Sequence, residues 1–196
     1  MDLETIDSKV NRLGFAIKRL NDLTVSKIQT RYSTTNLFSD KGGQIQFGLI
    51  APRYEFVEVE DRTVKQVVRD GAVLIEGAAP DPERPGFLDW KNKKITFSLG
   101  DKDIGDILYA LEKGAVNKNG ELVALFHKNV KDGGETSKTF KIKPGQTNSQ
   151  GQMTYLVELY NSTDKNKVSV FVGGPDLMRI KVALQAAFPI ILGWTA

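Results

Sequence analysis

Residues 41–49 have the sequence KGGQIQFGL, in which polar and apolar side chains alternate from Gln44 onward. Such alternation predicts a β-strand with one buried side and one polar side. The buried side would carry Ile45, Phe47 and Leu49, and the polar side Gln44 and Gln46. Three more strands are predicted at residues 54–59, 71–75 and 90–99, and a loop with three prolines, residues 80–86, precedes the last of them.

A helix is predicted after these strands, because the apolar side chains that follow Asp101 recur with helical spacing. Asp101 and Asp103 can cap its start, and Gly114 can provide a left-handed stop. The same order of elements then repeats. Four strands are predicted at residues 121–127, 138–143, 153–160 and 167–172, followed by an amphipathic helix that opens at Pro175 and that Pro189 should kink or cut. The pattern favours an α+β fold of two successive units, each with four strands and a helix.

Residues 1–40 have a different texture. Apolar side chains spaced by three and four residues predict an amphipathic N-terminal helix, and they are Leu3, Ile6, Val10, Leu13, Ile17 and Leu20. This helix could pack on its own domain or form a coiled coil. Residues 24–40 are rich in Ser, Thr and Asn and predict either an extended linker or an edge strand. We therefore divide the chain into an N-terminal helix and linker arm over residues 1–40 and a domain over residues 41–196.

The composition favours a binding protein over an enzyme. The chain has 196 residues, with 27 Lys and Arg against 24 Asp and Glu, and a net charge of +3. It has no cysteine and a single histidine, His127, which excludes disulfides, zinc fingers and a His-rich metal site within one chain. Phosphate-loop and dinucleotide-binding motifs are absent. We expect no cofactor, no metal, no catalysis and no membrane segment.

Three groups of motifs resemble the Whirly family of single-stranded-DNA-binding proteins. The first joins KGGQI at residues 41–45 to APRYEF at residues 51–56; the second joins DWKNK at residues 89–93 to FSL at residues 97–99; the third is FPIILGWTA at residues 188–196. The resemblance implies two antiparallel four-stranded sheets packed roughly perpendicular, each followed by a helix. It also implies a homotetramer joined by its helices. Gly43 replaces the second lysine of the family motif, so assemblies larger than tetramers are not carried over.

The family resemblance implies binding of single-stranded DNA with little sequence preference. Such binding needs cations for phosphates and aromatic faces for bases. The candidate nucleic-acid-binding residues are Lys41, Gln44, Gln46, Tyr54, Phe56, Phe87, Trp90, Lys91, Lys93, Lys94, Lys138, Lys141 and Lys143. Burial in the core is the alternative for the aromatic residues, and a solvated edge for the lysines. The excess of only three positive charges predicts that salt weakens binding measurably but incompletely.

Self-association is expected through apolar helix positions, and the candidate oligomerisation residues are Leu13, Ile17, Leu20, Leu184 and Phe188. The expected partner is single-stranded DNA, with RNA as an alternative, in replication, recombination or repair. The expected location is the cytoplasm or nucleoid of a bacterial or phage-infected cell, with an organelle left open. Two other functions also remain open: transcriptional regulation, and a Mg²⁺-dependent nuclease that would use Asp81, Asp89 and Lys91.

Overall fold

The computed structural model describes residues 34–38, 43–59, 62–131 and 134–192. The predicted N-terminal helix lies outside these residues, as do the candidates Lys41, Leu13, Ile17 and Leu20. The described chain forms two compact units. One contains residues 53–69, and the other contains the remaining described residues.

The larger unit begins with an antiparallel sheet whose strand order is β1-β2-β5-β6. Its strands are β1 (Thr35–Phe38), β2 (Gln44–Ile50), β5 (Ala72–Ala78) and β6 (Ile95–Leu99). The strand predicted from residue 44 onward is confirmed, with Ile45 and Phe47 buried. Residues 24–40 were predicted to be either an extended linker or an edge strand. Within them, Thr35–Phe38 form β1, which is an edge strand of this sheet. The domain boundary predicted after residue 40 therefore falls between two paired strands, because the sheet includes β1.

Residues 53–69 form the smaller unit, a two-stranded hairpin of β3 (Arg53–Val59) and β4 (Arg62–Arg69). The strand predicted at residues 54–59 exists, but it pairs with β4 and does not belong to the first four-stranded sheet. The sequence RTVKQVVR of β4 was not predicted as a strand, because its valines do not alternate with its polar residues.

The strand predicted at residues 90–99 begins only at Ile95. Residues 90–93 form a turn, in which Asp89 accepts a hydrogen bond from the backbone N–H of Asn92 at 3.0 Å. A carboxylate that binds the backbone in this way offers the chain an alternative to strand geometry. Trp90, Lys91 and Lys93 therefore lie in this turn and not on a strand.

The second sheet is antiparallel, with the strand order β10-β9-β8-β7, and it confirms all four predicted strands. Its strands are β7 (Val123–Lys131), β8 (Gly134–Thr147), β9 (Met153–Asn161) and β10 (Asn166–Gly173). On β8, Phe140 and Ile142 are fully buried, while Lys141 and Lys143 point to the opposite side, because successive side chains of a strand alternate between its two sides.

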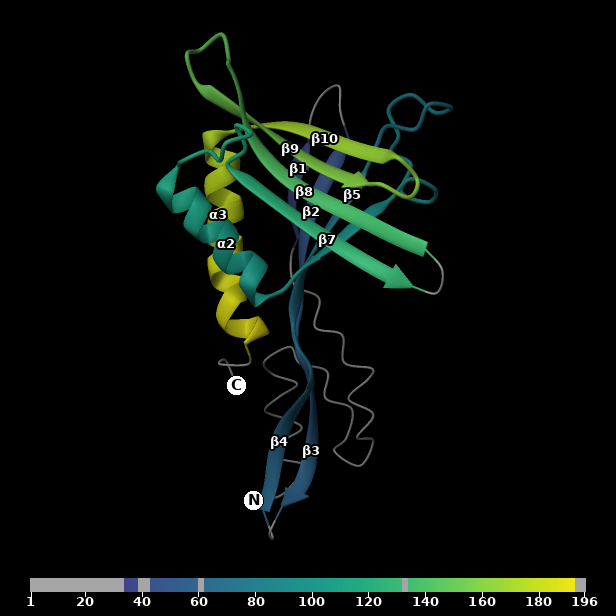
Figure 1. The fold of residues 1–196 in the computed structure, drawn as a ribbon, viewed down its shortest axis with the longest axis vertical. Helices are drawn as coiled ribbons and strands as arrows, with labels where there is room; N and C mark the ends of the chain where they lie inside the picture. Colours follow the sequence, from purple (N-terminus) through teal and green to yellow (C-terminus); the bar gives the residue numbers. More distant parts are fainter. Residues whose placement is uncertain (1–33, 39–42, 60–61, 132–133, 193–196) are drawn as a thin grey trace, which may run out of the picture. The chain divides into compact units, whose positions relative to one another are not determined.

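Two helices follow the two sheets and lie side by side (Figure 1). Helix α2 (Asp101–Lys113) starts where the Asp103 carboxylate accepts a hydrogen bond from the Gly100 N–H at 3.1 Å. It ends before Gly114, whose φ of 64° is left-handed, as predicted. Helix α3 (Gly174–Ile191) continues through Pro189, which removes one N–H close to the helix end. Of the two effects predicted for Pro189, a kink or a cut, the cut is wrong.

The hydrophobic core lies between the two sheets and under both helices. Figure 1 shows the strands of the second sheet crossing those of the first. Phe47 and Phe97 of the first sheet meet Phe140 of the second, with ring centroids 6.1 and 6.2 Å apart. The sheets approach closely at Gly77, where an added Cβ would lie 2.8 Å from the Leu159 side chain. This packing leaves one side of each sheet free to carry polar and aromatic side chains.

Candidate nucleic-acid interface

The second sheet presents a continuous surface of aromatic and charged side chains on the side away from the core. It arises because residues on each strand alternate between the core and this surface. We call this surface the outer face, and define it by Phe126, Thr139, Lys141, Lys143, Glu158, Tyr160, Lys167 and Phe171. Strand register places one row across all four strands, in the order Phe126, Thr139, Tyr160, Lys167.

Three aromatic side chains on the outer face are open to solvent. Phe126 on β7 is 60% exposed, Tyr160 on β9 is 38% exposed and Phe171 on β10 is 57% exposed. Phe126 and Phe171 lie on the two edge strands of the sheet. Large apolar rings are seldom left in water without a binding role when several share one face. Their flat surfaces suit unpaired bases.

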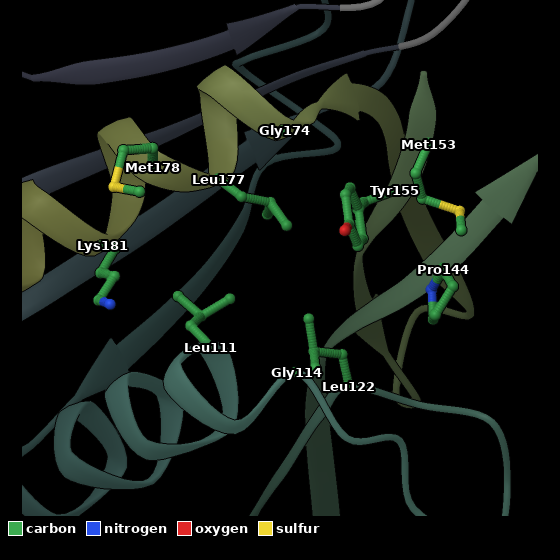
Figure 2. Close-up of a pocket in the computed structure, with 10 residues that line it drawn as sticks. All are labelled: Leu111, Gly114, Leu122, Pro144, Met153, Tyr155, Gly174, Leu177, Met178 and Lys181. Carbon is green, nitrogen blue, oxygen red and sulfur yellow. The ribbon is translucent and has the colours of Figure 1, made fainter. Parts of the chain in front are cut away.

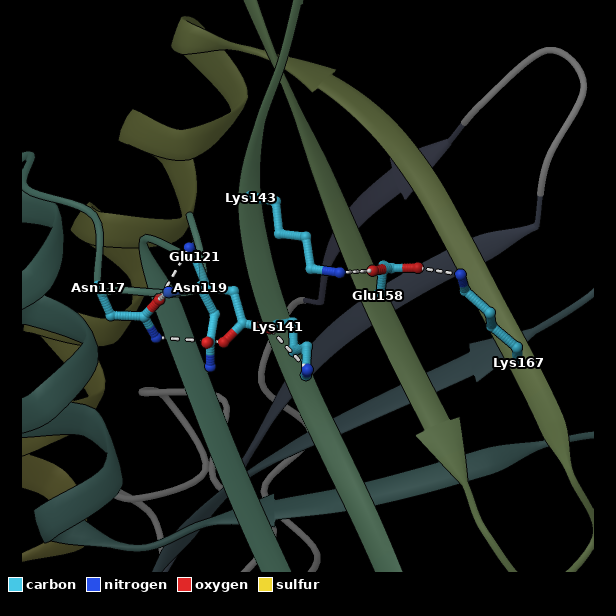
Figure 3. Close-up of polar contacts among 7 residues, drawn as sticks. All are labelled: Asn117, Asn119, Glu121, Lys141, Lys143, Glu158 and Lys167. Carbon is cyan, nitrogen blue, oxygen red and sulfur yellow. Dashed lines mark hydrogen bonds and ion pairs between the residues drawn. The ribbon is translucent and has the colours of Figure 1, made fainter.

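Glu158 lies between two lysines of the outer face and is only 5% exposed (Figure 3). The Lys143 ammonium lies 2.9 Å from Glu158 Oε2, and the Lys167 ammonium contacts Oε1. Ser169 also donates a hydrogen bond to Oε1, at 3.3 Å. Burial raises the pKa of Glu158, but the hydrogen bonds from Lys167 and Lys143 outweigh it and hold this pKa below the ordinary value. Glu158 is therefore ionised at neutral pH.

A second carboxylate, Glu121, lies beside Lys141 and is also 5% exposed. The Lys141 ammonium is 2.6 Å from Glu121 Oε1, and Asn117 donates to Oε2 at 3.1 Å (Figure 3). The hydrogen bond from Lys141, followed by that from Asn117, lowers the pKa of Glu121. The three lysines Lys141, Lys143 and Lys167 thus have two carboxylate partners, which leaves one net positive charge.

A shallow pocket of about 270 Å³ lies on the outer face. It is lined by Thr139, Lys141, Lys143, Glu158, Tyr160 and Lys167. One aromatic ring and three ammonium groups therefore surround the same depression. This arrangement can contact both a base and the phosphates next to it.

The outward side of the first sheet is polar and its groups bond to one another. Gln46 donates to Glu76 at 2.9 Å, and Lys94 forms an ion pair with Glu76 at 2.8 Å. Burial raises the pKa of Glu76, but the hydrogen bonds from Lys94 and Gln46 lower it overall. Gln44 donates to Asn36 at 3.0 Å. Both candidate glutamines lie on the predicted polar side, where they already have partners.

The loop between β5 and β6 holds a second group of candidates. Phe87 is 63% exposed, and the Arg84 guanidinium lies 5.7 Å from its ring centroid. Trp90 is half-buried, while Lys91 and Lys93 are exposed. The Arg84 guanidinium and the Phe87 ring together form an exposed surface on which a base could stack.

The carboxylates of the nuclease alternative have structural partners in this same loop. Asp81 forms an ion pair with Arg84 at 2.7 Å and accepts the Glu83 N–H at 3.0 Å. Asp89 is 7% exposed and holds the turn before β6. Within the described residues, no three His, Asp or Glu side chains lie close enough together to hold a metal ion.

Lys138 lies on the inward side of β8, and the hairpin aromatics belong to the other unit. The Lys138 ammonium donates to the backbone carbonyl of Thr96 on β6 at 2.8 Å, so it connects the two sheets. Tyr54 is half-buried and Phe56 is 53% exposed, and both belong to the hairpin unit. The structure therefore does not bring all the predicted binding residues together.

His127 has partners that its sequence neighbours do not indicate. Its ring stacks on Phe97 with a centroid distance of 4.2 Å, and its Nε2 lies 3.1 Å from Asp103 Oδ2. His127 therefore joins β7 to the start of α2.

The oligomerisation candidates on α3 differ in exposure. Leu184 is 1% exposed and packs within the core of its own chain, so we do not retain it as a subunit contact. Phe188 is half-buried against the same core. A groove of about 320 Å³ lies between the two helices and β8 and β9 (Figure 2). Met178, 57% exposed, and Tyr155 lie along it, and the Lys181 ammonium pairs with Glu112 nearby.

Several side chains of the interface were missed by sequence reasoning. They are Phe126, Tyr160, Lys167, Phe171 and the cation partner of Phe87, Arg84. The alternation within β7, β9 and β10 could have placed the first four on one side of the sheet. These side chains share a face because of the pairing register between the strands, and the sequence of a single strand does not specify that register.

Comparisons with known proteins agree with this architecture. Three plant structures resemble the chain at a TM-score of 0.57 or 0.58. WHY3 from Arabidopsis thaliana has a TM-score of 0.57 and 20% identity, over 83% of this chain and 90% of that one. WHY1 from Arabidopsis thaliana has a TM-score of 0.58 and 20% identity, over 83% of this chain and 92% of that one. The plant transcriptional regulator PBF-2 has a TM-score of 0.57 and 19% identity, over 84% of this chain and 86% of that one.

At such identities the structural likeness concerns the fold. No protein of curated function matches the sequence significantly. In the described part of the chain, neither helix is long and apolar enough to cross a membrane. The model of the family described as Whirly transcription factor matches residues 38–182, which include strands β2 to β10, helix α2 and the first half of α3. This chain belongs to the Whirly family.

Proposed function

We propose that the protein binds single-stranded DNA with little sequence preference, through the outer face of its second sheet. The observation that carries this proposal is the presence of Phe126, Tyr160 and Phe171, all exposed, on the same surface as three lysines. Aromatic stacking contributes about 1–3 kcal/mol per base and does not depend on which base stacks. Binding without catalysis or a cofactor is sufficient for this role.

Single strands fit this surface better than a duplex does. In a duplex the flat faces of the bases are stacked on one another, so only the charged backbone and the base edges can be reached. The three lysines of the outer face and their glutamate partners, Glu158 and Glu121, together leave one net positive charge. Because this surface has no strongly basic patch, an intact duplex would bind it only weakly through its phosphates.

A direct test compares three ligands by fluorescence anisotropy: a labelled oligo(dT), a DNA duplex and an RNA of equal length. We expect the oligo(dT) to bind most tightly and the duplex most weakly, with RNA showing whether the sugar matters. Equal affinity for duplex and oligo(dT) would contradict the proposal. Raising the salt concentration should weaken oligo(dT) binding with a shallow slope, because few phosphates are contacted.

Transcriptional regulation is the second candidate, and the description of the matching family as a transcription factor favours it. A regulator must prefer some sequences, whereas a protein that protects single strands in replication, recombination or repair need not. Selection of bound oligonucleotides from a random pool separates the two roles. Enrichment of a motif would favour regulation, and an unchanged pool would favour protection, with the protein located where single-stranded DNA arises, such as a nucleoid.

We also infer that the protein self-associates, with a homotetramer as the expected assembly. Met178 and Val182 on α3 are 57% and 55% exposed, which is unusual for apolar residues near each other on one helix. Light scattering coupled to size-exclusion chromatography measures the mass of the assembly. A Met178→Glu, Val182→Glu double variant should lower that mass, while a monomeric wild-type protein would contradict the inference.

A further inference from the structure

The outer face contains one buried carboxylate, Glu158, and a second, Glu121, lies beside it; a surface built only to hold phosphate would need neither. Each is 5% exposed: Glu121 pairs with Lys141, and Glu158 pairs with Lys143 and Lys167. Lysines facing a nucleic acid normally supply uncompensated charge. Here most of that charge is compensated within the chain before any ligand arrives.

We propose that Glu158, aided by Glu121, selects which part of a nucleotide this face accepts, admitting bases onto the rings around it and keeping phosphates away from its own position. This inference rests on the proposed binding of single-stranded DNA at the same face. It assigns to Glu158 a role in specificity that is separate from affinity.

The position of Glu158 supports this role. It lies on β9, in register with Lys141 on one side and Ser169 on the other, which is the middle of the face. The row next to it carries Phe126 and Tyr160. A base on these rings buries apolar area and needs no net charge. A phosphate over the centre would come close to an ionised carboxylate and be repelled.

The lysines beside Glu158 can still meet phosphates from the margin. An ammonium has three donors, and Lys143 and Lys167 each direct one toward Glu158. The Lys167 side chain is 56% exposed, and the Lys143 side chain is 35% exposed. Their remaining donors can reach a backbone that follows the edge of the face while its bases turn inward.

The test compares the wild-type protein with Glu158→Gln and with the matched control Glu112→Gln. Glutamine keeps the shape of glutamate and removes one negative charge. Glu112 lies on α2, where it is exposed and paired with Lys181, so the control changes the net charge equally at another place. The ligands are a labelled oligo(dT) and an abasic deoxyribose-phosphate strand of the same length, which carries phosphates and no bases.

We expect the wild-type protein to bind oligo(dT) far more tightly than the abasic strand. Glu158→Gln should raise affinity for the abasic strand about tenfold, with a smaller gain for oligo(dT), because phosphates gain access to the centre. The salt dependence of Glu158→Gln should steepen by about one unit of slope, as expected for one more phosphate contact. Glu112→Gln should change both affinities alike and by less than about twofold.

Equal gains in Glu158→Gln and Glu112→Gln would overturn the proposal, because net charge alone would explain them. Weaker binding by Glu158→Gln would also overturn it, since Glu158 would then serve to hold the lysines for phosphate. Circular dichroism and thermal unfolding check that the variant is folded, and Glu121→Gln provides the same test if it is not. Failure of the wild-type protein to bind oligo(dT) would instead reject the proposed function.

Discussion

Single side chains on the second sheet differ in role according to the side of the strand on which they lie. On β8, Phe140 is fully buried, and Lys141 beside it reaches the outer face. On β7, Leu125 is 9% exposed and Phe126 is 60% exposed. An aromatic residue on this sheet is therefore part of the core or part of the binding surface according to its parity in the strand.

Phe126→Ala should weaken oligo(dT) binding by about 5- to 150-fold, because one stacked base contributes about 1–3 kcal/mol. The unfolding free energy should change little, since this side chain is 60% exposed. Tyr109→Ala is the matched control, because Tyr109 is 66% exposed on α2, away from the outer face. Anisotropy titrations of both variants measure the effect, and equal loss in the two would show that Phe126 has no specific role.

The ionised glutamates make stability depend on acid pH. Both Glu121 and Glu158 have pKa values held below the ordinary 4.5, so the unfolded chain binds more protons than the folded one below that pH. The unfolding free energy should be constant above about pH 5 and fall as the pH drops further. Urea unfolding at a series of pH values measures this loss, which should be smaller in Glu158→Gln than in the wild-type protein.

At the scale of single elements, the residue types near its two ends predict where helix α2 begins and ends. Helix α2 starts after Gly100 and stops at Gly114, and both ends were predicted from the residue types. Asp103 also contacts His127 of β7 at 3.1 Å, which fixes the helix start against the second sheet. Asp103 therefore stabilises the helix start in two ways, through a local hydrogen bond from the Gly100 N–H and through a tertiary contact with His127.

Asp103→Ala should lower the unfolding free energy by about 1–2 kcal/mol, because it removes the hydrogen bond to the Gly100 N–H and the contact with His127. Asp106→Ala is the control on the same helix, since Asp106 has only an exposed ion pair with Lys102. Its loss should change stability by less than about 1 kcal/mol. Urea denaturation compares the two, and similar losses would mean that the cap contributes nothing beyond surface charge.

Gly77→Ala should destabilise the protein by about 1–3 kcal/mol, because the sheets leave no room for a methyl group. The added Cβ would lie 2.8 Å from Leu159 Cδ1 and 3.3 Å from Val168. Gly105→Ala is the opposite control: nothing lies within 4 Å of its Cβ position in α2, so it should stabilise the helix by up to about 1 kcal/mol. Thermal unfolding measures both, and a neutral Gly77→Ala would show that the sheets can separate without cost.

At the scale of the whole molecule, the described chain consists of a two-sheet unit and a separate hairpin. The hairpin of β3 and β4 is inserted between β2 and β5, which pair with each other up to Ile50 and Ala72. A two-stranded hairpin alone has little stability in water. The larger unit, by contrast, has the continuous core that stability requires.

Replacement of residues 53–69 by a two-residue turn should leave the two-sheet unit folded, because β2 and β5 can be joined by a tight turn. The shortened protein should unfold cooperatively and keep oligo(dT) affinity within about threefold, since the outer face is intact. A larger loss of affinity would assign binding to Tyr54 and Phe56 of the hairpin. Circular dichroism and anisotropy together distinguish loss of fold from loss of binding.

The sequence by itself determined the described strands other than β1 and β4, the helices α2 and α3, the buried side of β2, and both ends of α2. These features depend on neighbours within a few residues, through alternation, helical spacing and capping. The motifs at residues 41–56 and 89–99 also indicated the family correctly. The turn at residues 90–93 was mispredicted because a side chain, Asp89, competes with strand pairing there.

Only the tertiary structure decided which strands share a sheet and which side chains share a surface. Strand pairing placed β1 in the first sheet and β3 with β4, and register placed Phe126, Tyr160 and Lys167 in one row. It also gave Lys141 and Lys143 their carboxylate partners from other parts of the chain. These relations join residues far apart in sequence, so they follow from how the sheets pack and not from any local pattern.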